Sequence, residues 1–508
     1  MASERDGAGA AQSASQPTST AAAQPVAAKS PTLLAKFPDP DDQRVVLEGI
    51  DAVRRFDPVG GASKAKFKSR AEAALKKIDS QIQAVLLDCV ATEEFKRFEG
   101  AWRGLDFLVQ RLPRHEKIEL HLNSQTRESL IDGLLEGVSS KAAMEESEGF
   151  RRVWQRRLGA FNGDPFSSLI LGHEFDLRNR EHVDAVTVAA RIGEACLCPV
   201  VANASPTTFG KKTWADVAAG GPYDQLLNSD RFIALKDFRK SPAARFLSLG
   251  AGAVMARAPW SETERGQKSR TLEINELPQN ATGRLDRVPE ESCCWMRPSY
   301  ALGERLANSF VENGICCAFL GEMNGGMLDG LPYVLHQKTS GAEVKYGPGP
   351  DGWSDTKLEW MLANLGFLPL MFRENTRTMV FYSGQSMYRP PEYIEHDKNV
   401  AAKLSCRMQH LMPVTRVSQA LVRRGQQYVQ SQKSAQEVKV ALESWINGNF
   451  VSPEGSPSDV KRKKPFKSAN ISVEQDAGRY FLKVELCPHE MIDSIQATVE
   501  LVSGSARS

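Results

Sequence analysis

The sequence of 508 residues has no long apolar run and no strong excess of charge of either sign. No window approaches about 18 uninterrupted apolar residues, the length that a membrane-spanning helix needs, so we expect no direct membrane insertion. The opening residues, MASERDGAGAAQSASQ, have no apolar core that would serve as a secretory signal. Lys plus Arg number 64 and Asp plus Glu number 62, so no overall field attracts nucleic acid.

Cysteine is scarce, with nine residues in the chain. An odd number of cysteines without an export signal indicates reduced thiols and a cytoplasmic protein. A zinc site needs Cys or His pairs two to four residues apart, usually twice. Cys196 and Cys198, the adjacent pairs at 293–294 and 316–317, and the Cys487–His489 stretch do not form this pattern. We therefore predict small buried thiols and no metal site.

Signatures of enzymes are also missing. Gly60–Lys64 lacks the residue order of a phosphate-binding loop. The spacing of Gly347, Gly349 and Gly352 matches a dinucleotide-binding pattern, but two intervening prolines remove amide donors and no strand-to-helix context surrounds them. No Gly-x-Ser-x-Gly nucleophile elbow is present. We predict a protein with no catalytic residues and no cofactor, while a cytosolic enzyme with an unrecognised site stays open as an alternative.

What is present is an ordinary globular composition with mixed periodicity, typical of the α/β (mixed α+β) class. Strand-like runs at 168–172 and 199–202 flank a helical segment at 181–195, which predicts a βαβ unit with parallel pairing. Apolar residues three and four apart predict helices over 66–90 and 92–112, the second with an aromatic stripe that we expect to be core. Further expected elements are strands at 118–122, 315–320, 367–372 and 378–382 and helices at 127–139, 143–158, 300–312, 399–411, 414–429 and 435–447.

Changes in composition predict a division of the chain into six parts. Residues 1–40 are rich in Ala, Ser, Gln and Pro and are predicted to be a disordered tail, because they bury too little apolar surface to offset their ordering entropy. The remaining parts are a linker or arm at 41–65, α/β segments at 66–240 and 241–450, a linker at 451–466, and a C-terminal β-strand segment at 467–508. In that last segment, a hairpin is expected around Asp476–Gly478.

Specific stretches of this chain resemble a known family. Phe95–Leu105 is similar to the F-x-x-L-E-x-x-W-R-G-L segment of the large sheath subunit of type VI secretion systems (TssC, VipB or EvpB), with Phe98 in place of the usual Leu. The similarity continues in unbroken order over about residues 65–502. The matching pieces are Ala204–Pro206 with Phe209–Gly210, Ala244–Phe246, Gly325–Gly326 with Gly330–Pro332, Leu365–Leu370, and Gln385–Ser386 with Tyr393.

The resemblance implies a structural protein with a sheath-subunit fold, in which mixed sheets are flanked by helices and terminal strands are exchanged with neighbouring subunits. It implies pairing with a small sheath subunit (TssB/VipA-like) and with neighbouring sheath subunits in a helical sheath around an Hcp tube. A baseplate and a ClpV-type recycling ATPase are the other implied partners. A phage-tail-like contractile sheath, which assembles without a small subunit, is the alternative.

Two sets of residues are candidate contact sites. The alternating residues Ile495, Ala497, Val499 and Leu501 are the candidates for strand exchange, since an added strand pairs through its main chain and is selected by alternate side chains. The helix predicted over 435–447 is a candidate tube-facing element through Lys439 and Glu443.

Overall fold

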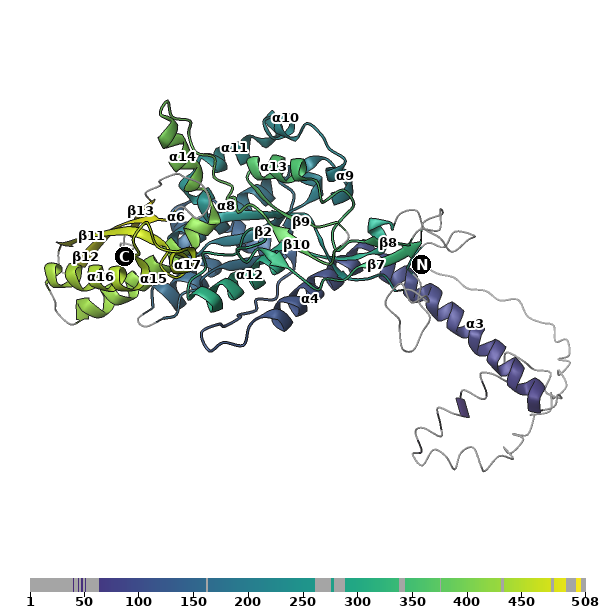
Figure 1. Cartoon of the computed structure of the whole chain (residues 1–508). Coiled ribbons are helices and arrows are strands. Elements are labelled where there is room, and N and C mark those ends of the chain that lie inside the picture. Colours follow the sequence, from purple (N-terminus) through teal and green to yellow (C-terminus); the bar gives the residue numbers. More distant parts are fainter. Residues whose placement is uncertain are drawn as a thin grey trace, which may run out of the picture. The chain divides into compact units, whose positions relative to one another are not determined.

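The structure is a computed structural model of the chain (Figure 1), and it describes residues 40, 44, 47–48, 51, 64–160, 163–260, 276–277, 288–337, 343–374, 376–430, 434–476, 479–489 and 499–503. Nearly all of the predicted tail and arm, residues 1–65, lies outside this set. The chain divides into two compact units, Met1–Ile82 and Gln83–Ser508. No described helix is both long enough and apolar enough to cross a bilayer.

A six-stranded mixed sheet forms the centre of the second unit. Its strand order is β1-β2-β3-β9-β10-β6. The strands β1 (Leu169–Phe175), β2 (Val200–Ala204), β3 (Leu247–Ala251) and β9 (Phe367–Phe372) pair in parallel, and β10 (Met379–Phe381) and β6 (Met327–Leu328) close the sheet antiparallel. The βαβ prediction is confirmed. The sheet takes strands from both sides of residue 240.

Helices cover both faces of this sheet. In Figure 1, α8 (Arg180–Ala195) lies above the strands and α12 (Pro298–Asn313) below them. β2 and β3 are buried at every position, as expected for parallel strands enclosed by helices. Asn203 in β2 is buried among them, and its side chain donates to the carbonyl oxygens of Leu171 and His173 and to the hydroxyl of Ser299. These bonds connect β2 to β1 and to the start of α12.

Small helices and hairpins complete the second unit around the sheet. They are α5 (Arg127–Leu135), α6 (Lys141–Glu146), α7 (Glu148–Phe150), η1 (Arg151–Leu158), α9 (Trp214–Ala218), α10 (Tyr223–Leu227), α11 (Ile233–Lys240), α13 (Thr356–Asn364), α14 (His396–Leu404), and the strand pairs β4–β5 (Val254–Arg257 with Cys294–Met296) and β7–β8 (Val334–Gln337 with Glu343–Tyr346).

The helix α4 (Glu93–Arg111) begins at the predicted N-cap, where the Thr92 side chain accepts a hydrogen bond from the backbone of Phe95. Its buried face is made by glycine. A Cβ at Gly100 would lie 2.1 Å from the carbonyl oxygen of Trp295, and one at Gly104 would lie 2.5 Å from the ring of Tyr300. The helix therefore touches the backbone of β5 at Gly100 and the Tyr300 ring of α12 at Gly104, and a Cβ at either position would prevent this contact.

A three-stranded antiparallel sheet is formed near the C-terminus by β11 (Phe466–Asp476), β12 (Arg479–Pro488) and β13 (Val499–Ser503). It packs on α15 (Met408–Gln430) and α16 (Ala435–Phe450). The expected pairing of 469–474 with 480–486 is confirmed. The short helix α17 (Ser458–Lys463) lies within the basic stretch that composition assigned to a linker.

Four expected features are wrong. The single helix expected over 143–158 is interrupted at Ser147, which is extended and lies between α6 and α7. Residues 118–122 form no strand, and Leu120 and Leu122 are 43% and 63% exposed. Residues 315–320 also form no strand, although Ile315, Phe319 and Leu320 are buried, because an apolar run can be buried without ladder pairing. The break predicted between 411 and 414 is absent, since α15 runs through Pro413 near its N-terminal end, where the missing donor affects one helical bond.

Substitution of Gly100 by Ala tests the close approach of α4. The new methyl group has to displace the Trp295 carbonyl, so we expect a loss of about 1–3 kcal/mol in the free energy of unfolding. Gly133→Ala in α5 is the matched control, because nothing lies within 4 Å of its Cβ, and it should gain up to about 1 kcal/mol from helix propensity. Denaturant unfolding measures both, and equal stability of the two variants would contradict the packing described.

Candidate assembly interface

The C-terminal sheet leaves two edges. Because the strand order is β11-β12-β13, only β12 has a partner on each side along its length. An edge strand carries unpaired backbone N–H and C=O groups that can pair with another chain. β11 has one further contact, an isolated parallel bridge between Val451 and Phe466. Among the residues that the structure describes, no further strand pairs with the outer side of β13, and β11 has only this bridge on its outer side.

One face of this sheet is buried against α15 and α16. On β12, Leu482, Val484 and Leu486 are buried, while Lys483 and Glu485 alternate with them on the other face. This period of two places the apolar residues on one side of the strand. These strand residues belong to a hydrophobic cluster between the sheet and the two helices. The helices contribute Val414, Val417, Leu421, Val438, Leu442 and Ile446 to it. A register slip by one residue would expose this apolar face, so the register is strongly specified.

The predicted strand-exchange residues fall partly within this sheet. Val499 and Leu501 lie in β13, where the backbone of Val499 pairs opposite Leu486 and that of Leu501 opposite Val484 of the same chain. Ile495 and Ala497 lie outside the described residues. The sequence therefore located a strand at the edge of the sheet, and its pairing with a neighbouring subunit remains a prediction.

The predicted tube-facing residues lie on α16. Val438, Leu442 and Ile446 form the buried face of this helix. Lys439 and Glu443 lie beside that face, about a third exposed, with 3.8 Å between the Lys439 Nζ and the Glu443 Oε1. Such an i,i+4 pair contributes a few tenths of a kcal/mol to the helix and leaves both groups able to meet a partner.

A buried Ser–His contact joins α16 to the end of β12. Ser452 and His489 are both 2% exposed, and their side chains lie 2.8 Å apart, Oγ to Nε2. The Ser452 hydroxyl also donates to the carbonyl of Lys464, and the backbone N–H of His489 donates to the carbonyl of Pro465. These hydrogen bonds connect the chain after α16, the residues before β11 and the end of β12, so the pair fixes the base of the sheet.

An aromatic ridge on α4 is the surface that sequence analysis missed. Phe95, Phe98, Trp102 and Val109 are 39%, 62%, 51% and 52% exposed, so the expectation that the stripe is core is wrong for these residues. Phe98 and Trp102 contact edge-to-face with 6.2 Å between ring centroids. The glycine face of α4 takes the buried position, and the aromatic face is left outward. The three- and four-residue spacing of apolar residues shows that they share one face of the helix. It does not show whether that face is buried in the core or exposed on the surface.

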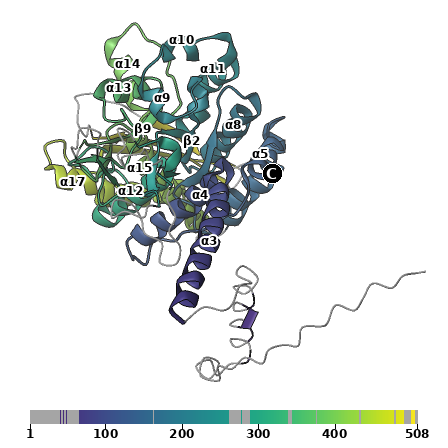
Figure 2. The same cartoon turned by 90° about the vertical axis from the view of Figure 1, so that its right-hand side faces the viewer.

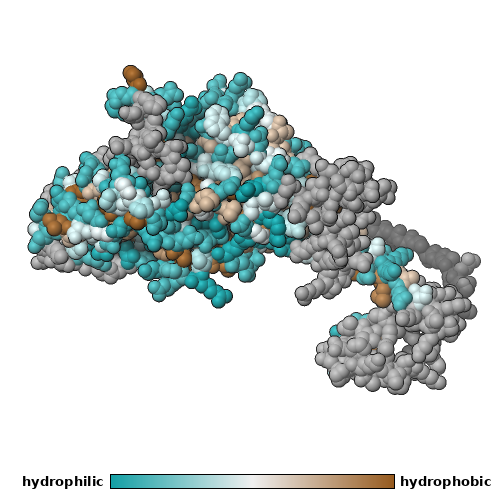
Figure 3. All heavy atoms as spheres, viewed as in Figure 1, coloured by the Kyte–Doolittle hydropathy of each residue, from teal (hydrophilic) through white to brown (hydrophobic). Residues whose placement is uncertain are grey.

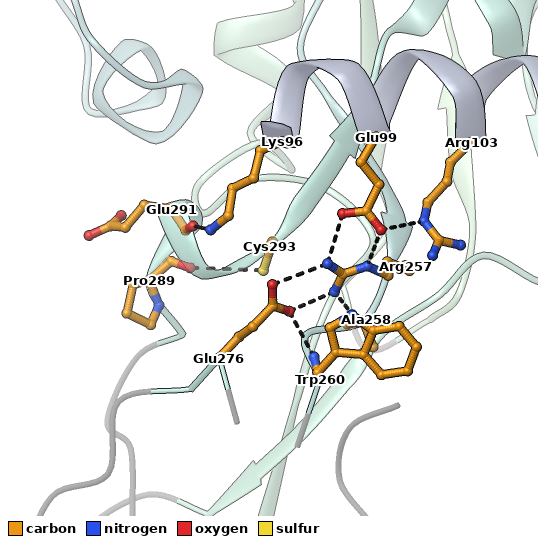
Figure 4. Close-up of polar contacts among 10 residues, drawn as sticks. All are labelled: Lys96, Glu99, Arg103, Arg257, Ala258, Trp260, Glu276, Pro289, Glu291 and Cys293. Atoms are coloured by element: carbon orange, nitrogen blue, oxygen red, sulfur yellow. Dashed lines mark hydrogen bonds and ion pairs between the residues drawn. The ribbon is translucent and has the colours of Figure 1, made fainter. Parts of the chain in front are cut away.

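The side of α4 that faces the molecule holds an ion-pair network (Figure 4). Arg257, with its side chain 3% exposed, contacts Glu99 through Nε and Nη2 at 2.6 and 2.8 Å, and Glu276 through Nη1 and Nη2 at 2.6 and 3.1 Å. Burial alone would raise the pKa of Glu99, but Arg257 and Arg103 hold that pKa below its usual value. The two carboxylates likewise raise the pKa of Arg257. The two arginines, Arg103 and Arg257, are balanced by the two carboxylates, Glu99 and Glu276. The network therefore positions α4 and is not a catalytic site.

The described residues contain neither a group of side chains placed to bind a metal ion nor a reactive thiol that the structure identifies. No group of three or more His, Cys, Asp or Glu is placed there to hold a metal ion. Cys196 and Cys198 are buried, and burial raises the pKa of the Cys196 thiol to about 12. Such thiols remain protonated and unreactive. The expectation of small buried thiols is confirmed for six cysteines, whereas Cys89 is exposed.

The face of the molecule in Figure 3 is mainly hydrophilic, with apolar residues in separate small areas. Among the described residues as a whole, exposed large apolar side chains include Trp360 and Ile394, at 70% and 107% exposure. Single exposed apolar residues are normal, and a single large apolar patch is the usual mark of an obligate flat interface. The apolar surface on this face is thus divided into small separate areas.

The buried Ser452–His489 pair makes the C-terminal sheet sensitive to acid. Burial, together with Lys461 and Lys467, lowers the pKa of His489 from its usual 6.5, while Ser452 and Glu454 act in the opposite direction. The unfolded chain then binds the proton more tightly than the folded one. Stability is therefore full above about pH 6.5 and falls as the pH drops through that value.

Thermal unfolding of the full chain and of His489→Gln, between pH 7.5 and pH 5, measures this dependence. The glutamine keeps a polar contact with Ser452 and cannot titrate, so we expect the variant to lose less stability on acidification than the unchanged chain. The exposed His115→Gln is the control and should follow the unchanged chain. Parallel profiles for all three would contradict a role for His489.

Two family models match this chain in succession. The N-terminal domain of the EvpB/VC_A0108 tail sheath (VipB) matches residues 72–388, and the gpW/gp25-like domain of the same tail sheath matches residues 397–504. The type VI secretion system sheath protein TssC1 of Pseudomonas aeruginosa is 25% identical over 438 residues, which are 85% of each chain. The chain thus belongs to the VipB/EvpB tail sheath family, as a large subunit of the type VI secretion sheath and not as an enzyme.

Proposed function

We propose that this large subunit pairs with a small sheath subunit of the TssB/VipA kind, and that the heterodimers stack as a helical sheath around an Hcp tube in the cytoplasm. Contraction of the sheath then propels the tube and its spike from a baseplate, and a ClpV-type ATPase recycles the contracted form. The observation that carries this proposal is the C-terminal sheet, in which β13 is the outermost of the described strands.

Strand exchange at this edge is energetically accessible. β13 pairs with β12 over the five residues from Val499 to Ser503. Antiparallel pairing uses the same backbone donors and acceptors whether the strand comes from the same chain or from a neighbour. Replacing one by the other therefore changes the free energy little within the sheet, while it links two subunits. A mesh of such links stays connected when the bodies of the subunits slide past one another.

Contraction needs no nucleotide in this chain. A gain of a few kcal/mol of subunit contact per copy, multiplied along a sheath, supplies a large stroke. The contacts themselves are heterologous and do not close on a pair, which is the geometry that generates helical filaments. The outward aromatic ridge of α4 supports further subunit contact, since desolvated Trp and Phe are common anchors of interfaces.

A chain truncated after residue 489 tests the role of the edge strand. Removal of residues 490–508 takes away β13 and leaves the buried cluster on α15 and α16 in place. We expect the truncated chain, co-expressed with the small subunit, to give a heterodimer but no sheath by negative-stain electron microscopy. Intact sheaths of normal length would overturn the assignment.

Co-expression also separates the proposed function from its alternative. A phage-tail-like sheath protein assembles alone, whereas the large subunit of a two-component sheath requires its small partner. Full-length chain that forms sheaths without any partner would favour the alternative.

The tube-facing role of α16 is tested by charge. Lys439→Glu places two like charges at i,i+4 and reverses the charge offered to a tube, so we expect loss of tube-filled sheaths. The exchange of both residues, Lys439→Glu with Glu443→Lys, keeps the pair within the helix. It should recover helix stability, measured by thermal unfolding, but not tube binding. Tube-filled sheaths at normal frequency in both variants would count against α16 as the tube-facing helix.

A further inference from the structure

The surface beside α11 is hollowed on both of its sides. One hollow encloses about 380 Å³ and is lined by α11, by the end of α10 and by Arg389. The other encloses about 550 Å³ and lies between α11 and α8. Figures 1 and 2 both show α8 and α11 side by side. Ile233, Leu235 and Asp237 line both hollows, so we treat them as one groove, the α11 groove.

The α11 groove is cationic in a chain that is nearly neutral. Three carboxylates line it, namely Asp184, Asp230 and Asp237. Eight cationic side chains line it, namely Arg178, Arg180, Arg191, Arg231, Lys236, Arg239, Lys240 and Arg389. The local excess is 8 − 3 = 5 positive charges, against a net charge of +2 for all 508 residues. Concave walls with charge of one sign concentrate the field on a ligand of the opposite sign.

Ion pairs within the protein account for part of this charge. Arg178 pairs with Asp176 at 2.9 Å, Arg180 with Asp184 at 3.4 Å, and Lys240 with Asp237 at 3.1 Å. The other cations have no carboxylate within 4.0 Å among the described residues; they are Arg191, Arg231, Lys236, Arg239 and Arg389. The unmatched charge is therefore concentrated around α11.

Arg239 is the most unusual of these residues. Its side chain is buried, with the residue 8% exposed, and it lines the smaller hollow. Its Nε donates to the carbonyl of Met387 at 3.1 Å, and its Nη2 lies against Gly366. Burial, with the positive charge of Arg389 as a smaller cause, lowers the pKa of Arg239 to about 10. A buried guanidinium without a counter-charge is costly, and that cost is recovered when an anion enters.

The groove also offers apolar surface beside its charge. Ile233 is 53% exposed between the two hollows, and Leu227 and Leu235 line the walls. Arg389 is held near the opening, where its Nη1 donates to the Asn228 side chain at 3.4 Å. A small inorganic anion would use the charge but leave Ile233 exposed. An extended peptide with acidic and apolar side chains would use both.

We propose that the α11 groove binds an acidic segment of a partner protein, with a carboxylate seated against Arg239 and Arg389 and an apolar side chain on Ile233. This deepens the assembly function proposed above, because a sheath component would supply the segment. Binding in the α11 groove is separate from the C-terminal sheet and involves no strand pairing. Because charge dominates it, the affinity for the acidic segment falls as the ionic strength rises.

Binding of a defined peptide tests the groove in the full-length chain without any partner. The probe is a fluorescein-labelled peptide, Leu-Glu-Glu-Leu-Glu-Glu-Leu, followed by fluorescence anisotropy at low ionic strength. We expect saturable binding, and about tenfold weaker binding to Arg389→Glu. Lys117→Glu, an exposed charge reversal outside the groove, is the matched control and should bind as the unchanged chain does. No saturable binding, or equal binding to both variants, would overturn the proposal.

A small anion as the true ligand is distinguished by competition. Inorganic phosphate at the concentration of the peptide should not displace it, and displacement at equal concentrations would assign a free-anion site instead. Arg239→Met separates ligation from a structural role. We expect this variant to lose peptide binding while thermal unfolding shows no loss of stability, since it removes an unmatched buried charge. Unchanged binding with reduced stability would make Arg239 a structural residue and overturn its assignment.

Photo-crosslinking in the assembled sheath tests the same groove with its natural partner. A benzophenone amino acid in place of Ile233 should form crosslinks to an Asp/Glu-rich segment, identified by mass spectrometry. Crosslinks only to segments without acidic residues would overturn the inference. Failure to assemble any sheath would bear on the proposed function, while the peptide measurement would still decide the inference.

Discussion

A β-sheet that ends in an edge strand leaves backbone hydrogen-bonding groups without partners, and this constraint shapes the C-terminal part of the chain. The antiparallel sheet β11-β12-β13 buries one face firmly on α15 and α16, so its register is fixed by Leu482, Val484 and Leu486. Among the described residues, no strand pairs with the outer side of β13, and β11 has only the Val451–Phe466 bridge on its outer side. One face of the sheet is therefore fixed by packing, while its edge groups are the ones that strand pairing can use.

The larger sheet forms the frame to which the assembly surfaces are fixed. Arg257, held bidentately by Glu99, connects β4 to α4 from inside, and Gly100 allows that helix to touch the backbone of β5. Together they fix the rotation of α4 about its own axis, because its glycine and acidic face cannot turn away without breaking buried charge contacts. The aromatic ridge with Phe98 and Trp102 is exposed as a consequence. The exposed side of α4 is thus held in a fixed orientation by the packing of its opposite face.

Helices and strands were predicted correctly from the sequence where a residue pattern is explained by only one kind of local structure. The βαβ unit over 168–202 was predictable because buried parallel strands and an amphipathic helix have different periods, and Thr92 was a recognisable N-cap. The strand expected at 315–320 failed because a buried apolar run is not by itself a strand. The aromatic stripe of α4 was assigned to the core because its spacing carries no information about which face glycine would occupy.

The candidate contact sites were predictable to different degrees. The alternation around Val499 and Leu501 located an edge strand, since period two is a local property. The α11 groove was out of reach, because it joins α8, α11 and Arg389, which are far apart in sequence. No local pattern signals that Arg239 is buried without a counter-charge. That property exists only when the fold brings Met387 and Gly366 against it.

The two proposed kinds of contact, strand exchange at the C-terminal sheet and peptide binding in the α11 groove, differ physically in ways that suit a sheath that changes shape. Backbone pairing at the C-terminal sheet is directional and largely insensitive to salt, so it suits links that persist through contraction. A charged groove makes contacts that form quickly, weaken with distance and exchange readily for water. Contacts of the second kind can differ between the extended and contracted states at small cost per subunit. In the proposed sheath, the free energy of the stroke is stored in the contacts that change, while the proposed strand links transmit it along the filament.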